Sequence, residues 1–257
     1  MTLTSKSILI AIVTITAVVG IGWHMTDRPV RIATNAVIVA DVSGSTADGH
    51  ASILGIAETY LNKPKLTEGS TLTVITTGDE KSANEARWVG KYEVPYSRRA
   101  FDGKNALLKR KRELLSNLDA NLQAVRRTDR SPIFLGVKSA IEQLRAGGCR
   151  ADSECFLFVR TDGEELSEPA IKRALESTTP PKGLPDPTAN EGIKVMFCGL
   201  AETNDSKSSE AASRRPVHNA RHGDRIRQVW SSLFSVPDLV RFEPYCPKSE
   251  NTSIAEK

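Results

Sequence analysis

The most constraining feature of the chain is the alternation of short apolar runs with amphipathic stretches that begins after Pro29. The apolar runs have the length and composition of strands buried on both faces, and they lie at 36–41, 70–78, 155–161 and 193–200. The stretches between and after them place apolar residues at helical spacing, which predicts helices at 49–62, 103–127, 132–145, 168–176 and 224–234. This alternation predicts a mostly parallel sheet with helices on both faces.

Two further stretches complete the predicted sheet. Residues 86–94, ARWVGKYEV, alternate apolar and polar side chains, which predicts an antiparallel edge strand with one solvated side. Residues 238–245 predict a last strand, and the polar segment 201–224 predicts a mobile loop. The predicted fold class is therefore α/β, three-layered and Rossmann-like.

The first 28 residues form a separate predicted segment, followed by the domain at 29–246 and a polar, frayed tail at 247–257. The 16 residues from 8 to 23 are nearly all apolar and uncharged. As a helix they would span roughly 24 Å, a little less than a bilayer core of about 30 Å. We favour a short N-terminal transmembrane helix that anchors the chain, with a cleaved signal peptide as the alternative. Either interpretation places the domain on the periplasmic or extracellular side of the membrane.

The chain has four cysteines, at positions 149, 155, 198 and 246. None of them forms a C-x-x-C motif, which argues against a zinc site or a redox motif. An even number of cysteines in an exported domain favours disulfides, and three connectivities are compatible with the sequence.

Two acidic segments follow apolar strands. Asp41-Val42-Ser43-Gly44-Ser45 follows the first strand, and Thr161-Asp162-Gly163 follows a central one. Because the carboxyl ends of parallel strands lie at one edge of a sheet, we expect Asp41 and Asp162 to share that edge. Carboxylate and hydroxyl oxygens suit Mg²⁺, and Mn²⁺ or Ca²⁺ are alternatives.

With a hydroxyl residue before the helix at 132–145, these segments resemble the von Willebrand factor type A (VWA) domain family and its metal-ion-dependent adhesion site. The resemblance spans about residues 34–245 and implies a VWA fold. It implies that Ser43 and Ser45 bind the metal directly, while Asp41 and Asp162 hold the ion and its waters.

The third ligand segment departs from the family pattern. The family has Thr-x-Leu or Thr-Pro-Leu there, and this chain has Ser131-Pro132-Ile133. Ser131 keeps the hydroxyl ligand but lacks the methyl group that restricts a threonine side chain. We prefer Ser131 because it lies at the start of a helix, with Thr128 as the alternative.

The resemblance implies metal-dependent protein binding without a catalytic step, in which an Asp or Glu of a partner protein completes the metal shell. It also makes the fifth and sixth strands parallel neighbours, which favours a bridge between Cys198 and Cys246. Cys149 and Cys155 would then close the short loop before the strand at 155–161.

Two other functions are considered. A metal-dependent phosphohydrolase would use Asp41 as its nucleophile, but Ser43 stands where such enzymes carry their general acid. A basic-surface binder of nucleic acid or anionic lipid would use residues 109–112, but no aromatic residues are interleaved there, and we do not expect a nucleic-acid partner. The remaining loop carboxylates near these strand ends are expected to be solvated: Asp79, Glu80, Glu164 and Glu165.

Overall fold

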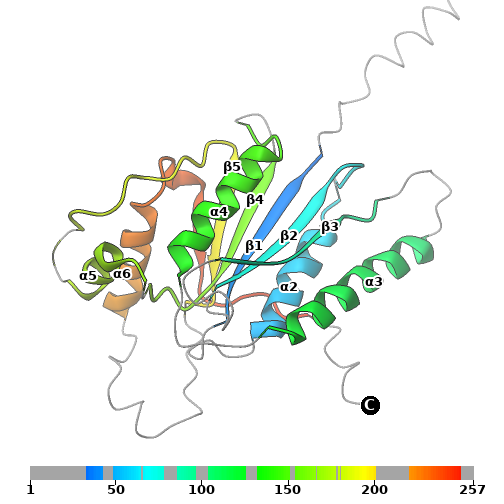
Figure 1. The fold of residues 1–257 in the computed structure, drawn as a ribbon, viewed down its shortest axis with the longest axis horizontal. Coiled ribbons are helices and arrows are strands. Elements are labelled where there is room, and N and C mark those ends of the chain that lie inside the picture. The colour runs from blue at the N-terminus through cyan, green and yellow to red at the C-terminus, as the bar shows by residue number, and fades with distance from the viewer. Residues whose placement is uncertain are drawn as a thin grey trace, which may run out of the picture. The chain divides into compact units, whose positions relative to one another are not determined.

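A six-stranded sheet with the order β3-β2-β1-β4-β5-β6 lies at the centre of the computed structural model (Figure 1). All neighbouring strands are parallel except β2 and β3, which are antiparallel, so the prediction of one antiparallel edge strand is confirmed. The strands are β1 (Asn35–Asp41), β2 (Thr71–Thr77), β3 (Arg87–Glu93), β4 (Cys155–Arg160), β5 (Ile193–Cys198) and β6 (Val240–Glu243).

The structure describes residues 33–42, 49–64, 66–77, 86–96, 104–125, 132–150, 154–165, 167–177, 179, 181–200 and 220–249. The helices are α2 (Gly49–Leu61), α3 (Lys104–Gln123), α4 (Ile133–Ala146), α5 (Pro169–Glu176) and α6 (Ala220–Ser231), with a 3₁₀ turn η3 (Pro237–Leu239). Helix α6 begins four residues before the predicted start at 224. Its first turn, Ala-Arg-His-Gly, has no large apolar residue, so helical periodicity does not mark it.

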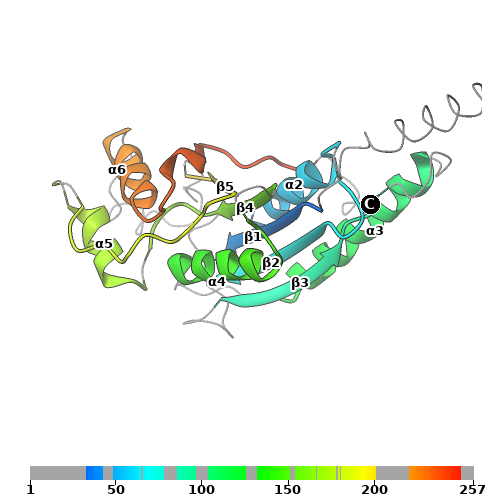
Figure 2. The same cartoon turned by 90° about the horizontal axis from the view of Figure 1, so that it is seen from above.

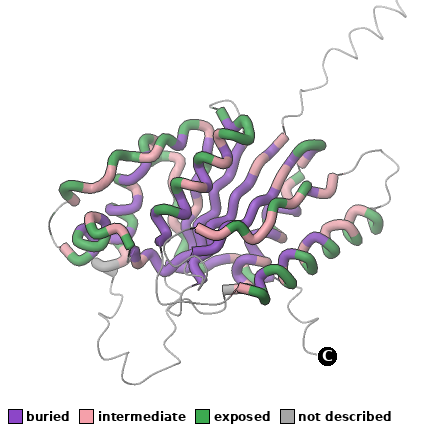
Figure 3. The backbone as a smooth tube through the Cα atoms, in the orientation of Figure 1, coloured by how far each residue is buried: buried purple, intermediate pink, exposed green. Residues whose placement is uncertain are grey.

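Two apolar cores lie on the two faces of the sheet, as alternation along each strand requires. Odd-numbered residues of β1, such as Val37 and Val39, pack with α4, α5 and α6. Even-numbered residues, such as Ile38, pack with α2 and α3. Figure 2 shows α2 and α4 on opposite sides of β1, and Figure 3 shows the central strands buried. The fold is therefore a three-layered, Rossmann-like α/β domain.

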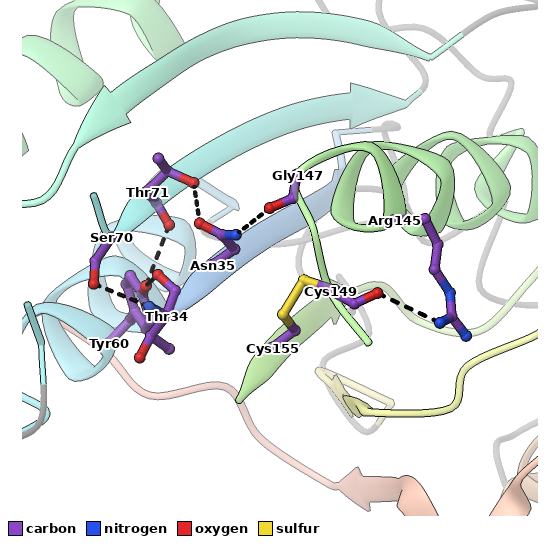
Figure 4. Close-up of a disulfide and its surroundings, with 9 residues drawn as sticks. All are labelled: Thr34, Asn35, Tyr60, Ser70, Thr71, Arg145, Gly147, Cys149 and Cys155. Carbon is purple, nitrogen blue, oxygen red and sulfur yellow. Dashed lines mark hydrogen bonds between the residues drawn. A yellow bond between two sulfur atoms is a disulfide. The ribbon is translucent and has the colours of Figure 1, made fainter. Parts of the chain in front are cut away.

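Two disulfides staple the domain, and both expected pairs are confirmed. Cys149–Cys155 closes a loop with a sequence separation of 6, and Cys198–Cys246 links residues separated by 48. Figure 4 shows the first disulfide near Asn35. The Asn35 side chain donates a hydrogen bond to the carbonyl of Gly147 at 3.0 Å and accepts one from the Thr71 hydroxyl at 2.9 Å. This polar network lies at the amino-terminal ends of β1 and β2.

The chain after Cys246 packs on α2, and residues 247–249 are thus ordered where the sequence predicted a frayed tail. The backbone N–H of Ser249 donates to the carbonyl of Ala51 at 3.4 Å, and the Ser249 hydroxyl donates to Glu58 at 2.8 Å. A Cβ at Gly55 would overlap the carbonyl group of Pro247. Only glycine therefore fits at this crossing.

Within the described part of the chain, no helix combines the length and the apolar composition needed to cross a bilayer. The predicted anchor at 8–23 lies outside the described residues.

Candidate functional site

The carboxyl ends of β1, β2 and β4 form the edge of the sheet at which the predicted site lies. Asp41 is the last residue of β1 and pairs in register with Thr77, the last residue of β2. On the other side, Ala40 pairs with Arg160, the last residue of β4, and Thr161 and Asp162 follow at once. We call this edge the rim, and define it by Asp41, Thr77, Thr161 and Asp162.

The Asp41 carboxylate lies almost fully buried at the rim, with 1% of its surface exposed. Its Oδ2 accepts a hydrogen bond from the Thr161 hydroxyl at 3.3 Å, a long distance for a bond between two oxygen atoms. Its backbone carbonyl accepts a second bond, at 2.9 Å, from the guanidinium of the buried Arg160. A buried carboxylate costs free energy unless donors or a cation compensate its charge, and Thr161 supplies one such donor.

Asp162 contributes the second carboxylate of the rim and is 4% exposed. Its Oδ1 accepts the backbone N–H of Glu164 at 3.0 Å, which orients the side chain within the turn. Thr161 anchors the same turn, because its hydroxyl also accepts the backbone N–H of Gly163 at 2.9 Å. The turn is thus held by hydrogen bonds within the chain that do not use the second oxygen, Oδ2, of Asp162.

Gly163 gives the turn its shape. Its φ is +89°, a region that residues with a Cβ rarely adopt, and a Cβ here would lie 2.6 Å from Cγ2 of Ile226. Its carbonyl accepts a hydrogen bond from the indole Nε1 of Trp230 at 3.0 Å. Trp230 is fully buried, so α6 fixes the turn that carries Asp162.

Thr77 was not among the predicted site residues. Its side chain is fully buried beside Asp41, and within the described part of the chain its hydroxyl has no hydrogen-bond partner. Buried hydroxyls are rarely left unsatisfied, because the lost hydration is not replaced. An unsatisfied oxygen next to a buried carboxylate fits a hydrated cation, whose waters would donate to it. The residues present therefore fit a divalent metal ion.

Glu165 is the main correction to the predictions for this region. It was expected to be a solvated loop charge, but it is 1% exposed. Its Oε2 accepts the backbone N–H of Phe134 at 2.7 Å. Its Oε1 accepts the N–H groups of Ser167 at 2.7 Å and Glu168 at 3.1 Å. Burial raises the pKa of Glu165, the three N–H groups oppose that rise, and the nearby charge of Asp41 adds to it.

The other predicted ligands lie outside the described residues: Ser43, Ser45, Ser131 and the alternative Thr128. The described residues that flank them are positioned at the rim or beside it. Val42, which precedes Ser43, donates its N–H to the carbonyl of Thr77 at 2.9 Å. Helix α4, which starts just after Ser131 and Pro132, packs so closely at Gly136 that a Cβ would lie 2.6 Å from Cγ2 of Thr77.

The structure thus brings together Asp41 and the turn that carries Asp162, from strands remote in sequence. Within the described ranges, no group of three His, Cys, Asp or Glu side chains is arranged to hold a metal ion. Asp79 and Glu80 lie outside those ranges. A serine or threonine next to a strand end was the available sequence signal for Thr77 and Thr161, whereas no local signal marks Glu165.

Comparisons with known proteins find neither a family model nor a curated protein that matches the chain. Among solved structures, the chain is similar to an aerotolerance-related membrane protein from Bacteroides fragilis, with 13% identity and a TM-score of 0.40 over 87% of this chain and 94% of that one. It is also similar to the conserved hypothetical protein BatB from Bacteroides thetaiotaomicron, with 11% identity and a TM-score of 0.37 over 86% and 95%.

A third similar structure is the manganese-loaded TRAP protein of Plasmodium vivax, with 11% identity and a TM-score of 0.37. The match covers 74% of this chain and 66% of that one, just under two thirds of its length. At these levels of similarity, the functional proposal depends on the residues of this chain.

Proposed function

We propose that the chain is a VWA-like binding module that recognises a partner protein through a divalent metal ion, most simply Mg²⁺, at the rim. The observation that carries the proposal is the meeting of Asp41 with the Thr161–Asp162 turn beside the unsatisfied hydroxyl of Thr77. Chain segments about 120 residues apart supply these oxygens, which a simple helix cap or local turn does not require.

In this proposal Ser43, Ser45 and Ser131 supply neutral hydroxyl ligands, and Asp41 and Asp162 supply the negative charge. When bound, the ion offers a coordination position to an acidic group of another molecule. With neutral hydroxyls as its direct ligands and the two carboxylates acting through bound waters, the ion keeps a positive inner shell, which favours an Asp or Glu from the partner. Thr161 orients Asp41 through its hydrogen bond, and the Thr77 hydroxyl would accept a hydrogen bond from a water of the bound ion.

The proposed activity is binding rather than catalysis. The residue two positions after Asp41 is Ser43, which lacks the proton-transfer chemistry of a carboxylic acid. The apolar segment at 8–23 supports a membrane tether, which would present the rim to partners outside the cytoplasm.

Calorimetric titration of the full chain with Mg²⁺ and Mn²⁺ tests the metal site. We expect saturable binding near one ion per chain that is lost in the double variant Ser43→Ala/Ser45→Ala. The matched control is Ser231→Ala/Ser232→Ala, which removes two hydroxyls from the end of α6. Absence of binding to the wild-type chain would refute the metal site.

A pulldown with and without EDTA, at two salt concentrations, tests the mode of partner binding. We expect EDTA and Asp41→Ala to abolish capture and added salt to weaken it only modestly. Capture that resists EDTA but collapses with salt would instead indicate the basic surface at 109–112.

A further inference from the structure

Glu165 joins two parts of the fold that are remote in the sequence. One of its carboxylate oxygens accepts the N–H of Phe134 in the first turn of α4, 31 residues away. The other accepts the N–H groups of Ser167 and Glu168 in its own loop. Because only 1% of its surface is exposed, water cannot readily replace these hydrogen bonds to the Glu165 carboxylate.

The bond to Phe134 replaces a missing local cap. The first N–H groups of a helix have no partner within the helix and are normally satisfied by a Ser, Thr, Asp or Asn at the N-cap. The N-cap of α4 is Pro132, which makes no side-chain capping bond. Glu165 therefore acts as a cap supplied from another loop.

Each of the two residues joined by the capping bond is a near neighbour in sequence of a ligand of the proposed metal site. Phe134 is three residues after Ser131, and Glu165 is three residues after Asp162. A shift of the first turn of α4 relative to the turn after β4 would change the distance between Phe134 and the turn that carries Asp162. Close packing of Gly136 on Thr77 and Val39 holds the next turn of α4, and Ile133 and Phe134 of the first turn are buried in the core. The bond from Phe134 to Glu165 adds a directional restraint between this helix start and the turn after β4.

We propose that Glu165 is a positioning residue, whose long-range capping bond to Phe134 sets the geometry between the first turn of α4 and the rim and thereby the divalent-metal affinity. This inference rests on the proposed function, because it requires that the rim bind a metal ion. Loss of a group that hydrogen-bonds a metal ligand typically weakens metal affinity by roughly 10- to 100-fold. Glu165 acts through a helix start rather than on a ligand, so we expect an effect near the lower end of that range.

Two variants separate the effect of the length of the Glu165 side chain from the effect of its negative charge. Glu165→Asp keeps the negative charge and the short-range bond to Ser167, but it is one methylene too short to keep the bond to Phe134. Glu165→Ala removes all three bonds. The matched control is Glu168→Ala, which removes the carboxylate that caps α5 through Ala170 and leaves the α4 cap in place.

The experiment measures Mn²⁺ affinity of the full chain by electron paramagnetic resonance, at a temperature at which every variant used is folded. We expect both Glu165 variants to bind Mn²⁺ about 10-fold or more weakly than wild type, and Glu168→Ala to bind within about twofold. The melting temperature falls in all three variants, so affinity rather than stability is the informative measurement. If Glu165→Ala does not fold, the Mn²⁺ affinities of Glu165→Asp and Glu168→Ala are compared, and this comparison tests the positioning role.

Wild-type affinity in Glu165→Asp, or equal weakening in Glu168→Ala, would overturn the positioning role while leaving the proposed function intact. Failure of the wild-type chain to bind Mn²⁺ would instead overturn the proposed function, and the positioning role with it.

Discussion

Thr161 donates a hydrogen bond from its hydroxyl to Oδ2 of Asp41 across 3.3 Å, although the two residues are 120 positions apart. The same hydroxyl accepts the N–H of Gly163 at 2.9 Å, so its one proton is directed at the carboxylate. The parallel pairing of β1 with β4 produces this contact, because it ends both strands at one edge. One hydroxyl thereby couples the orientation of Asp41 to the turn that carries Asp162.

Replacement of Thr161 tests this coupling. Thr161→Val keeps the shape but loses both hydrogen bonds, and we expect it to cost about 1–3 kcal/mol in the free energy of unfolding. We also expect it to weaken Mg²⁺ binding roughly 10-fold. Thr161→Ser keeps the hydroxyl and should retain most of the affinity in calorimetry. Equal affinities for the valine and serine variants would show that the hydroxyl does not matter.

Gly136 is the point of closest approach between α4 and the rim. A Cβ there would lie 2.6 Å from Cγ2 of Thr77 and 2.9 Å from Cγ1 of Val39, so Gly136→Ala must push the helix from the sheet. We expect a loss of about 1–3 kcal/mol in denaturant unfolding. The control is Gly223→Ala in α6, where a Cβ meets no atom within 4 Å, and it should be neutral or stabilise by up to about 1 kcal/mol. A neutral Gly136→Ala would contradict this packing.

Gly55 allows the chain after Cys246 to cross α2. Gly55→Ala should displace residues 247–249, because the new methyl group overlaps the Pro247 carbonyl group. We expect lower stability and faster hydrogen exchange at the N–H of Ser249, which bonds Ala51. In a chain shortened to end at Cys246, the same substitution should cost little. An equal loss of stability in the full and the shortened chain would show that the overlap with Pro247 is not the cause.

The two disulfides should contribute unequally to stability. In the chain-entropy model, a loop closed over 48 residues stabilises by about 4 kcal/mol and one closed over 6 residues by about 2 kcal/mol. We therefore expect Cys198→Ser/Cys246→Ser to lower the free energy of unfolding more than Cys149→Ser/Cys155→Ser. Denaturant titration of both variants under oxidising conditions measures the difference. The reverse order would mean that local packing outweighs loop closure.

Glu165 should make stability depend on pH. Burial raises its pKa above the ordinary value of 4.5, so the folded chain binds this proton more tightly than the unfolded chain. The contribution of Glu165 to stability therefore falls as pH rises from about 4.5 through the folded pKa, and it is constant above that. Metal-free wild type should lose stability relative to Glu165→Gln across this window.

Denaturant unfolding at a series of pH values measures that difference. Glu142→Gln, on the exposed side of α4, controls for the loss of one charge. If the difference in the free energy of unfolding between wild type and Glu165→Gln does not change with pH, the raised pKa of Glu165 is contradicted.

Local sequence patterns were sufficient to predict most of the secondary structure and the sheet topology of this protein. Apolar runs identified β1, β2, β4 and β5, and helical spacing identified the five helices of the described residues in order, because residue periodicity is a property of short segments. Alternation in 86–94 identified β3 as the edge strand, since in a sheet covered by helices a strand with one solvated side is expected at the edge. Parallel topology then predicted that Asp41 and the turn at Asp162 would share one edge of the sheet, as they do.

Tertiary structure alone decided the remainder, because contacts between distant segments leave no local pattern. Glu165 follows a strand end and resembles any loop carboxylate in sequence, yet its partner Phe134 lies in α4, 31 residues earlier. The buried hydroxyl of Thr77 and the crossing of Pro247 over Gly55 likewise depend on register and packing. The sequence determined which residues carry carboxylate and hydroxyl oxygens, and the packed sheet and helices determined which of them meet.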